Sequence, residues 1–165
     1  ETLADAVDAH FDRAMSAEAI ATDDLPRERL FEVIMLRFEA MEEYRDGLKS
    51  LLRYRETQPS ILLRLPVARA ASARWALASA GLDDDSGAPL SLKVLAIAFV
   101  IARTERAWRK ETSGDFALTM ATLDKSLRAA EERMGWVSRF SGRSATKQQE
   151  PEQENDAPEN GAIGE

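Results

Sequence analysis

The sequence predicts an all-α fold, a bundle of about six helices around a single core. Apolar side chains recur every three or four residues along most of the chain, and this is the period of an amphipathic helix. No segment alternates apolar and polar residues as a half-buried strand would. Short stretches rich in proline, glycine and aspartate separate the periodic segments, as is typical of helix boundaries. With 165 residues, the chain is long enough to bury one hydrophobic core.

The first helix is expected from Glu1 to about Ala21. Its inner face is predicted to consist of apolar side chains spaced four residues apart, namely Leu3, Val7, Phe11 and Met15. The segment TDDLPRER then interrupts the pattern. We expect Asp24 to be the N-cap of the next helix and Pro26 to lie in its first turn, where proline is tolerated. The helical period then continues past a bend expected near Tyr44 to Gly47.

Two more helices are expected in the middle of the chain. One runs from about Pro59 to Ala80, with a kink at Pro66 and with Gly81 as its C-terminal stop. The next runs from about Pro89 to Glu111 and begins with LSLKVLAIAFVIARTERAW, which contains nine consecutive apolar residues. One face of this helix consists of Leu92, Leu95, Phe99 and Ala102. The nearly opposite face consists of Val94, Ile97, Ile101 and Trp108. Since a surface helix normally has a single apolar face, the second face needs a cover of its own.

The last helix is expected from about Phe116 to Met134, with Asp115 as its N-cap. Its apolar residues alternate spacings of four and three, which is a heptad seam: Phe116, Met120, Leu123, Leu127, Ala130 and Met134. We therefore expect the last two helices to pair with those of a second chain in a two-fold, four-helix interface. The expected interface residues are Leu92, Leu95, Phe99, Phe116, Met120, Leu123 and Leu127. The alternative is a monomer in which the apolar helix is simply central, because periodicity does not separate the two.

Charge and composition argue against several function classes. The net charge is −7 at pH 7, which is unusual for a free-standing nucleic-acid binder. The chain has no cysteine, and therefore no disulfide and no cysteine-based metal site. Its longest apolar run is too short to span a membrane and no signal peptide precedes the domain, so we expect a cytoplasmic protein. Residues 141–165 are polar and carry −4 of the net charge, and we predict that they form a disordered acidic tail after a folded domain of residues 1–140.

No motif indicates catalysis, a cofactor or a metal site, and we do not expect an enzyme. The single histidine, His10, lacks a neighbouring nucleophile motif, and the acidic stretch from Asp83 to Gly87 lacks the ligand spacing of an EF-hand. Large apolar side chains are spread over three expected helices, and such residues line pockets for hydrophobic ligands as well as ordinary cores. We expect a pocket between the helices that bear Phe38, Trp75 and Phe99. The candidate pocket residues are Phe31, Met35, Phe38, Met41, Trp75, Phe99 and Trp108.

Three segments together resemble a known family. They are DLPRERLFEVIMLRFEAMEEYRDGLKSLL, SARWALASAGL and LAIAFVIARTERAWRKETSGDFALTMATLDKSLRAAEER. In this order they resemble the C-terminal effector-binding and dimerisation domain of TetR-type transcriptional regulators, over about Glu1 to Arg133. The sequence is most similar to a branch that resembles the accessory lipid-binding proteins of ubiquinone biosynthesis, which share the fold.

The resemblance implies a homodimer whose last two helices form the interface and whose body binds a hydrophobic small molecule or lipid. In such regulators a three-helix DNA-binding unit precedes the domain, and the helix from Glu1 to Ala21 would connect to it. Operator DNA would then be contacted only through an upstream unit that these 165 residues do not contain. The alternative is a lipid- or isoprenoid-binding accessory protein of ubiquinone biosynthesis, and a third possibility is an isolated dimerisation module.

Overall fold

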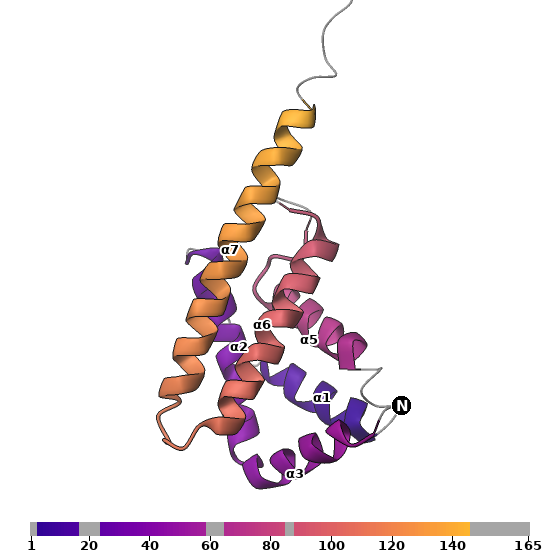
Figure 1. Cartoon of the computed structure of the whole chain (residues 1–165), viewed down its shortest axis with the longest axis vertical. Helices are drawn as coiled ribbons and strands as arrows, with labels where there is room; N and C mark the ends of the chain where they lie inside the picture. Colours follow the sequence, from indigo (N-terminus) through magenta and orange to yellow (C-terminus); the bar gives the residue numbers. More distant parts are fainter. Residues whose placement is uncertain (1–2, 17–23, 59–64, 85–87, 146–165) are drawn as a thin grey trace, which may run out of the picture.

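The computed structural model describes residues 3–16, 24–58, 65–84 and 88–145, with side chains described as far as residue 135. These residues form no strand and six helices: α1 (Leu3–Ala14), α2 (Pro26–Glu42), α3 (Arg45–Glu56), α5 (Leu65–Ser79), α6 (Leu90–Lys110) and α7 (Ala117–Ala145). The predicted all-α bundle is therefore confirmed for this part of the chain. The α6 helix packs between α5 and α7, α2 packs against α1 and α7, and α3 closes the lower end (Figure 1).

The second helix begins and ends close to the predicted positions. Pro26 is its first residue, as expected, but the N-cap is Leu25 rather than Asp24. The carboxylate of Glu28 accepts a hydrogen bond from the backbone N–H of Leu25 at 3.4 Å, so a side chain inside the first turn replaces the expected cap. The predicted bend is confirmed, because α2 ends at Glu42 and α3 begins at Arg45, with Tyr44 outside helical geometry.

The predicted stop at Gly81 is also confirmed. Gly81 has a φ of +65°, in the left-handed region that glycine adopts without strain. The N–H of Leu82 donates to the carbonyl of Leu77 at 2.8 Å and that of Gly81 donates to Ala78 at 3.0 Å, which together form a Schellman motif. Pro66 lies in the first turn of α5 and not at a kink inside it. The earlier part of the expected helix, residues 59–64, lies outside the described residues.

The last helix is longer than the sequence pattern predicts. The α7 helix runs to Ala145, past the expected end at Met134 and past the expected domain boundary at residue 140. Its C-terminal turns extend beyond the other helices (Figure 1). Residues 146–165 lie outside the described residues, so the acidic tail stays a prediction, as does the part of the first helix from residue 17 to 21.

The core lies where α2, α5, α6 and α7 meet. Its fully buried side chains include Val33, Ile34, Phe38, Ala73, Leu77, Ile97, Ile101, Trp108, Leu123 and Leu127. Phe11 on α1 and Met15 directly after its end are buried as predicted, but Leu3 is 76% exposed. The buried face of α1 is rotated, and it includes the carboxylates of Asp8 and Asp12.

Candidate functional site

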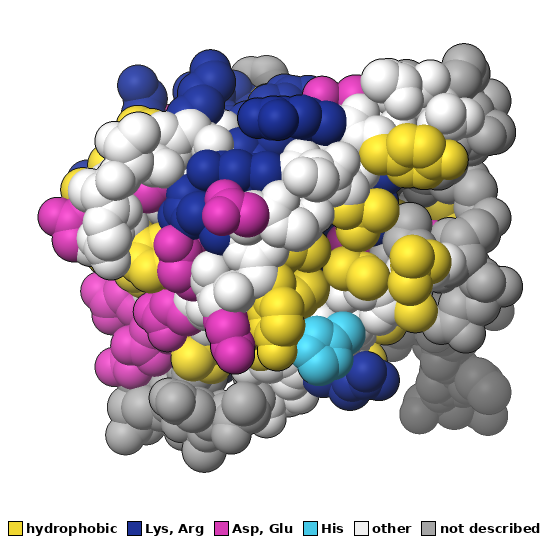
Figure 2. Space-filling view, turned by 90° about the horizontal axis from the view of Figure 1, so that it is seen from below, with side chains coloured by type: hydrophobic (Ala, Val, Ile, Leu, Met, Phe, Trp, Pro, Cys, Tyr) yellow, Lys and Arg dark blue, Asp and Glu magenta, His cyan; other side chains and the backbone are white. Residues whose placement is uncertain are grey.

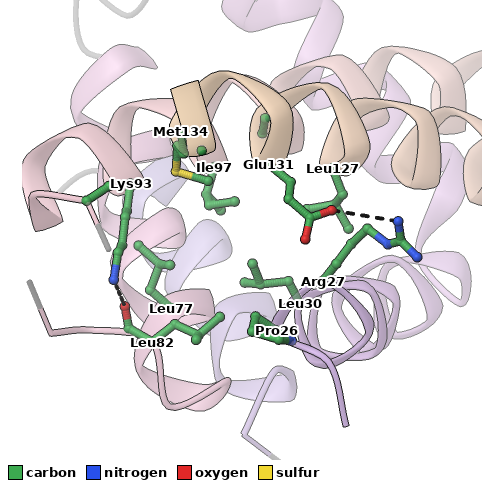
Figure 3. A pocket seen from close by; sticks show the side chains of 13 residues that line it. Pro26, Arg27, Leu30, Leu77, Leu82, Lys93, Ile97, Leu127, Glu131 and Met134 are labelled. Atoms are coloured by element: carbon green, nitrogen blue, oxygen red, sulfur yellow. Dashed lines mark hydrogen bonds and ion pairs between the residues drawn. The ribbon is translucent and has the colours of Figure 1, made fainter. Parts of the chain in front are cut away.

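A mainly apolar cavity of about 360 Å³ lies between α2, α5, α6 and α7. Figure 3 shows side chains from all four helices around it. Its apolar lining consists of Pro26, Leu30, Leu77, Leu82, Ala88, Ile97, Leu127, Ala130 and Met134. A cavity of this size is at the lower end of the range that holds small organic ligands. The lining favours an apolar ligand, because a polar ligand would lose hydration without gaining partners.

The end of α5 forms one wall of this cavity, and hydrogen bonds hold it in place. The Schellman turn brings Leu77 and Leu82 together on the cavity side. Arg29 of α2 donates from Nη1 to the carbonyl of Ala80 at 2.8 Å. A Cβ at Gly81 would lie 3.4 Å from the same Nη1 atom, which is an ordinary contact, so glycine is favoured here by its positive φ and not by a lack of space.

Three charged side chains also line the cavity. The ammonium of Lys93 donates to the carbonyls of Leu82 and Asp84 at 3.3 and 2.9 Å and to the Asp84 carboxylate at 3.2 Å. All three of its protons are therefore engaged in holding the loop after α5. Across the cavity, Arg27 and Glu131 form a loose ion pair of 3.7 Å between α2 and α7 (Figure 3). Because both side chains are partly exposed, this pair can rearrange around the polar end of a ligand.

The pocket predicted from the sequence is not where the structure has its cavity. None of the seven candidates lines this cavity: Phe31, Met35, Phe38, Met41, Trp75, Phe99 and Trp108. Phe38 and Trp108 fill the core, with ring centroids 6.4 Å apart, and Met35 and Met41 are buried beside them on α2. Trp75 is 42% exposed, and Phe31 and Phe99 lie at other surface grooves. Large side chains fill space, whereas the cavity remains where leucines and small alanines meet at helix ends.

The two faces predicted for α6 are confirmed. Val94, Ile97, Ile101 and Trp108 are buried in the core. On the other face Leu95 is 68% and Phe99 is 55% exposed, and Leu92 is half-buried. These residues line a groove between α6 and α7 of about 460 Å³, with Ser126, Ala129 and Met134 opposite. We call Leu92, Leu95 and Phe99 the outer face of α6.

The heptad seam of α7 faces a different direction from the one predicted. Leu123, Leu127 and Ala130 are buried within their own chain, where α7 packs on α2 and α6. Phe116 is half-buried and Met120 is 38% exposed. Leu123 and Leu127 are therefore core residues of this chain, and their expected contact with a partner stays a prediction. Heptad spacing suits helix packing within one chain as well as between chains, and here α2 and α6 occupy the seam.

A buried ion-pair cluster was missed entirely at the sequence level. It contains three arginines and three carboxylates: Asp8, Asp12, Arg37, Arg55, Arg69 and Glu105. Arg37 donates from Nε to Asp12 at 2.8 Å, and Asp8 accepts from Arg37, Arg55 and Arg69 at 3.1 to 3.4 Å. Burial alone would lower the pKa of Arg69, but its ion pairs with Glu105 and Asp8 raise it. The cluster is neutral overall and joins five helices, so it positions α1 on the body.

Glu111 caps the last helix, in place of the predicted Asp115. Its carboxylate accepts from the backbone N–H groups of Leu118 and Thr119 at 2.8 and 3.1 Å and from the Ser113 hydroxyl at 2.7 Å. Asp115 accepts from the backbone N–H of Ala117 at 3.2 Å and interacts with the Ser113 hydroxyl, but it does not reach the N–H groups of Leu118 and Thr119. The Ser113 hydroxyl and these N–H groups lower the pKa of Glu111 to about 2 against the opposing effect of its burial. A glutamate six residues before the helix supplies the cap because Phe116, with a φ of +56°, turns the chain back.

Other site types find no support in the described residues. Within them, no group of three or more histidine or acidic side chains is placed to hold a metal ion. His10 is exposed and packs edge-on against Phe11. No helix in the described ranges is long and apolar enough to cross a bilayer. Comparison of the chain with protein-family models, curated proteins and solved structures finds no match.

Proposed function

We propose that this chain is the effector-binding and dimerisation domain of a TetR-type transcriptional regulator. The observation that carries the proposal is the outer face of α6. Leu95 and Phe99 expose most of their apolar surface beside a groove along α7, in a chain that buries the opposite face of the same helix. Exposed, contiguous apolar side chains of this size favour a protein partner. In a dimer with two-fold symmetry, each chain would cover the outer face of α6 of the other chain.

The effector is proposed to occupy the cavity between α2, α5, α6 and α7. It is a small apolar molecule or lipid fragment with at most one polar end, matched to the aliphatic lining and to the Arg27–Glu131 pair. Ala130 and Met134 line this cavity and also the groove beside Phe99. An effector that repositions them would change the surface offered to the partner. It acts only if it binds one arrangement more tightly than the other.

Operator DNA is proposed to be bound by a unit that precedes α1 in the full regulator. Ligand occupancy would then change the spacing of two such units in the dimer. The accessory lipid-binding alternative expects the same cavity but no operator. An electrophoretic shift assay with promoter DNA, using protein extended upstream in the gene, separates the two. A DNA-binding unit with ligand-sensitive binding supports the regulator, whereas an extension without one supports the lipid-binding protein.

The dimer proposal is tested by Phe99→Glu, compared with Val67→Glu as a control at an exposed apolar site on α5. Phe99 would be buried twice in a symmetric interface, at ~1.5–3 kcal/mol per side chain, so its loss should weaken association at least about a hundredfold. Sedimentation velocity should show a wild-type and Val67→Glu dimer and a folded Phe99→Glu monomer. Leu123→Arg should unfold the chain instead, since Leu123 is inside the core. A monomeric wild type at high micromolar concentration would refute the dimer.

A further inference from the structure

A basic groove lies between α3 and the C-terminal half of α6. It has a volume of about 330 Å³ and is lined by Lys49, Arg53, Glu56, Arg106, Arg109 and Lys110. Five of these six residues are cations, although the chain as a whole carries a net charge of −7. Figure 2 looks at this end of the molecule and shows lysine and arginine side chains gathered on one side of it. We call this feature the basic groove.

The cations stand along both walls of the groove. Lys49 and Arg53 are four residues apart on α3, and Arg106 and Lys110 are four residues apart on α6, so each pair is separated by about 6 Å along its helix. A single ion pair crosses the groove, from Arg109 Nη1 to Glu56 Oε1 at 2.6 Å. The remaining four cations have no salt bridge within the described ranges. Five cations and one carboxylate thus line one concave surface, and four of the cations form no ion pair among the described residues.

These cations affect the pKa of Glu56, the one carboxylate among the residues that line the groove. The hydrogen bond from Arg109 lowers the pKa of Glu56, burial opposes it, and the charges of Arg109, Arg106 and Arg53 each add a smaller lowering effect. Conversely, the hydrogen bond that Arg109 donates to Glu56 raises the pKa of Arg109. Glu56 thereby holds Arg109 in position, and the other four cations outnumber this single carboxylate, so the groove still attracts a negatively charged ligand.

The two walls are held at a fixed separation from the inner side. Arg55 of α3 binds Asp8 at 3.1 Å, Asp8 also binds Arg69 at 3.4 Å, and Arg69 pairs with Glu105 of α6. This chain of buried ion pairs connects α3 to α6. A ligand therefore meets a preorganised surface and does not have to order the two helices first.

The helix dipole explains only part of the cluster. Arg53, Arg109 and Lys110 lie in the last turns of their helices, where positive charge is favourable. Lys49 and Arg106 lie about one turn earlier, and their repulsion of the other cations remains uncompensated. No large apolar side chain lines the groove, which argues against insertion into a lipid surface. The compact, concave shape favours a small anion with several charges over a long polymer.

We propose that the basic groove binds a compact oligophosphate, a small molecule with two or three linked phosphate groups. Guanidinium groups bind phosphate oxygens through paired hydrogen bonds, and the lysines add point charges on both sides. This ligand is distinct from the apolar effector, and its site does not depend on the proposed dimer or on any operator.

Calorimetric titration of the full chain with inorganic tripolyphosphate tests the proposal. We expect one saturable site whose affinity falls as salt rises from about 50 to 200 mM, because exposed charges are screened. The variant Arg53→Gln/Arg106→Gln should bind at least about tenfold more weakly. The control Arg13→Gln/Arg74→Gln removes two exposed arginines from α1 and α5 and should bind like the wild type. Melting curves check that both variants are folded.

Titrations with other anions show which class of phosphate ligand the groove prefers. Orthophosphate should bind more weakly than tripolyphosphate, and a nucleoside triphosphate should bind at least as well if the natural ligand is a nucleotide. Absence of tripolyphosphate binding would overturn the proposal, as would equal loss in the two double variants. A short DNA duplex that binds more tightly than tripolyphosphate, and does so through Arg53 and Arg106, would replace the compact ligand with a nucleic-acid backbone.

Discussion

Replacing Asp12 by asparagine should destabilise the chain more than any surface charge change. Asp12 is buried and accepts hydrogen bonds from Arg37 Nε and the Ser72 hydroxyl, both at 2.8 Å. The guanidinium of Arg37 is only 1% exposed, so water does not compensate it when the carboxylate is neutralised. Breaking a buried pair in this way costs about 3–5 kcal/mol. Arg37 keeps a second contact to Asp8 at 3.3 Å, which places the expected cost near the lower end, about 3 kcal/mol.

The matched control is Asp124→Asn on α7. Asp124 pairs with Arg128 at 3.0 Å, but both side chains are at least 41% exposed, so the pair should contribute less than about 1 kcal/mol. Urea unfolding followed by circular dichroism should show a lower midpoint for Asp12→Asn with an unchanged slope, since the surface exposed on unfolding is the same. For a domain of this size, a loss of about 3 kcal/mol corresponds to a melting temperature roughly 10 °C lower.

A second substitution distinguishes ion pairing from packing. If Arg37 is destabilised by its unpaired charge, Asp12→Asn/Arg37→Met should be less destabilised than the sum of the two single variants. Additive losses would show that the two residues act independently. The reasoning is refuted if Asp12→Asn and Asp124→Asn differ by less than about 0.5 kcal/mol, which is the usual range for surface changes.

Two further predictions concern the cavity and the start of α7. Ala88→Phe should fill part of the cavity, raise the free energy of unfolding by about 0.5–2 kcal/mol and abolish retention of an apolar ligand in native mass spectrometry, whereas Ala71→Phe on the exposed side of α5 should do neither. Retained ligand in the filled variant would place the site elsewhere. Glu111→Gln should lower the melting temperature at neutral pH, because the pKa of Glu111 falls from 4.5 to about 2 on folding and the carboxylate stabilises the folded state fully above pH 4.5. The difference from wild type should disappear as the pH falls through about 2, and a difference independent of pH would exclude the charged cap.

Helix positions could be predicted from the sequence because their signals are local. Pro26 and the apolar period place α2 and α6 within a few residues of their observed bounds, and Gly81 places the end of α5. Caps were less predictable, because Glu28 accepts from an N–H three residues before it and Glu111 accepts from an N–H seven residues after it, and spacing alone does not reveal such contacts. Hydrophobic periodicity likewise assigns charged residues to the exposed face of a helix, so it does not reveal charged side chains that are buried. The one available signal for the ion-pair cluster was the position of Asp8 and Asp12 on the same side of α1 as Phe11 and Met15.

The cavity could not be predicted in the same way, because an empty volume is a property of several helices together. Phe38 and Trp108 were reasonable pocket candidates by size, yet their bulk is what closes the space around them. The cavity depends instead on the crossing of α2 and α7 near the end of α5, where Leu77 and Ala130 leave a gap. No periodic pattern encodes such a crossing, since the same spacing fits several interhelical angles.

The location of Ala130 and Met134 gives the proposed regulator a physical connection between ligand and partner. Both residues line the cavity on one side of α7 and the groove beside Phe99 on the other. In the proposed dimer, a ligand that changes their packing would change the affinity between the two chains, and by linkage association would change the affinity for the ligand by the same factor. The α1 helix is not part of this connection, because Asp8 and Asp12 hold it to α2, α3 and α5 and none of its described residues lines the cavity. A signal from the cavity therefore reaches α1 only through movement of α2, α5 or α6, and disruption of the cluster by Asp12→Asn should weaken that transmission while leaving the ligand contacts intact.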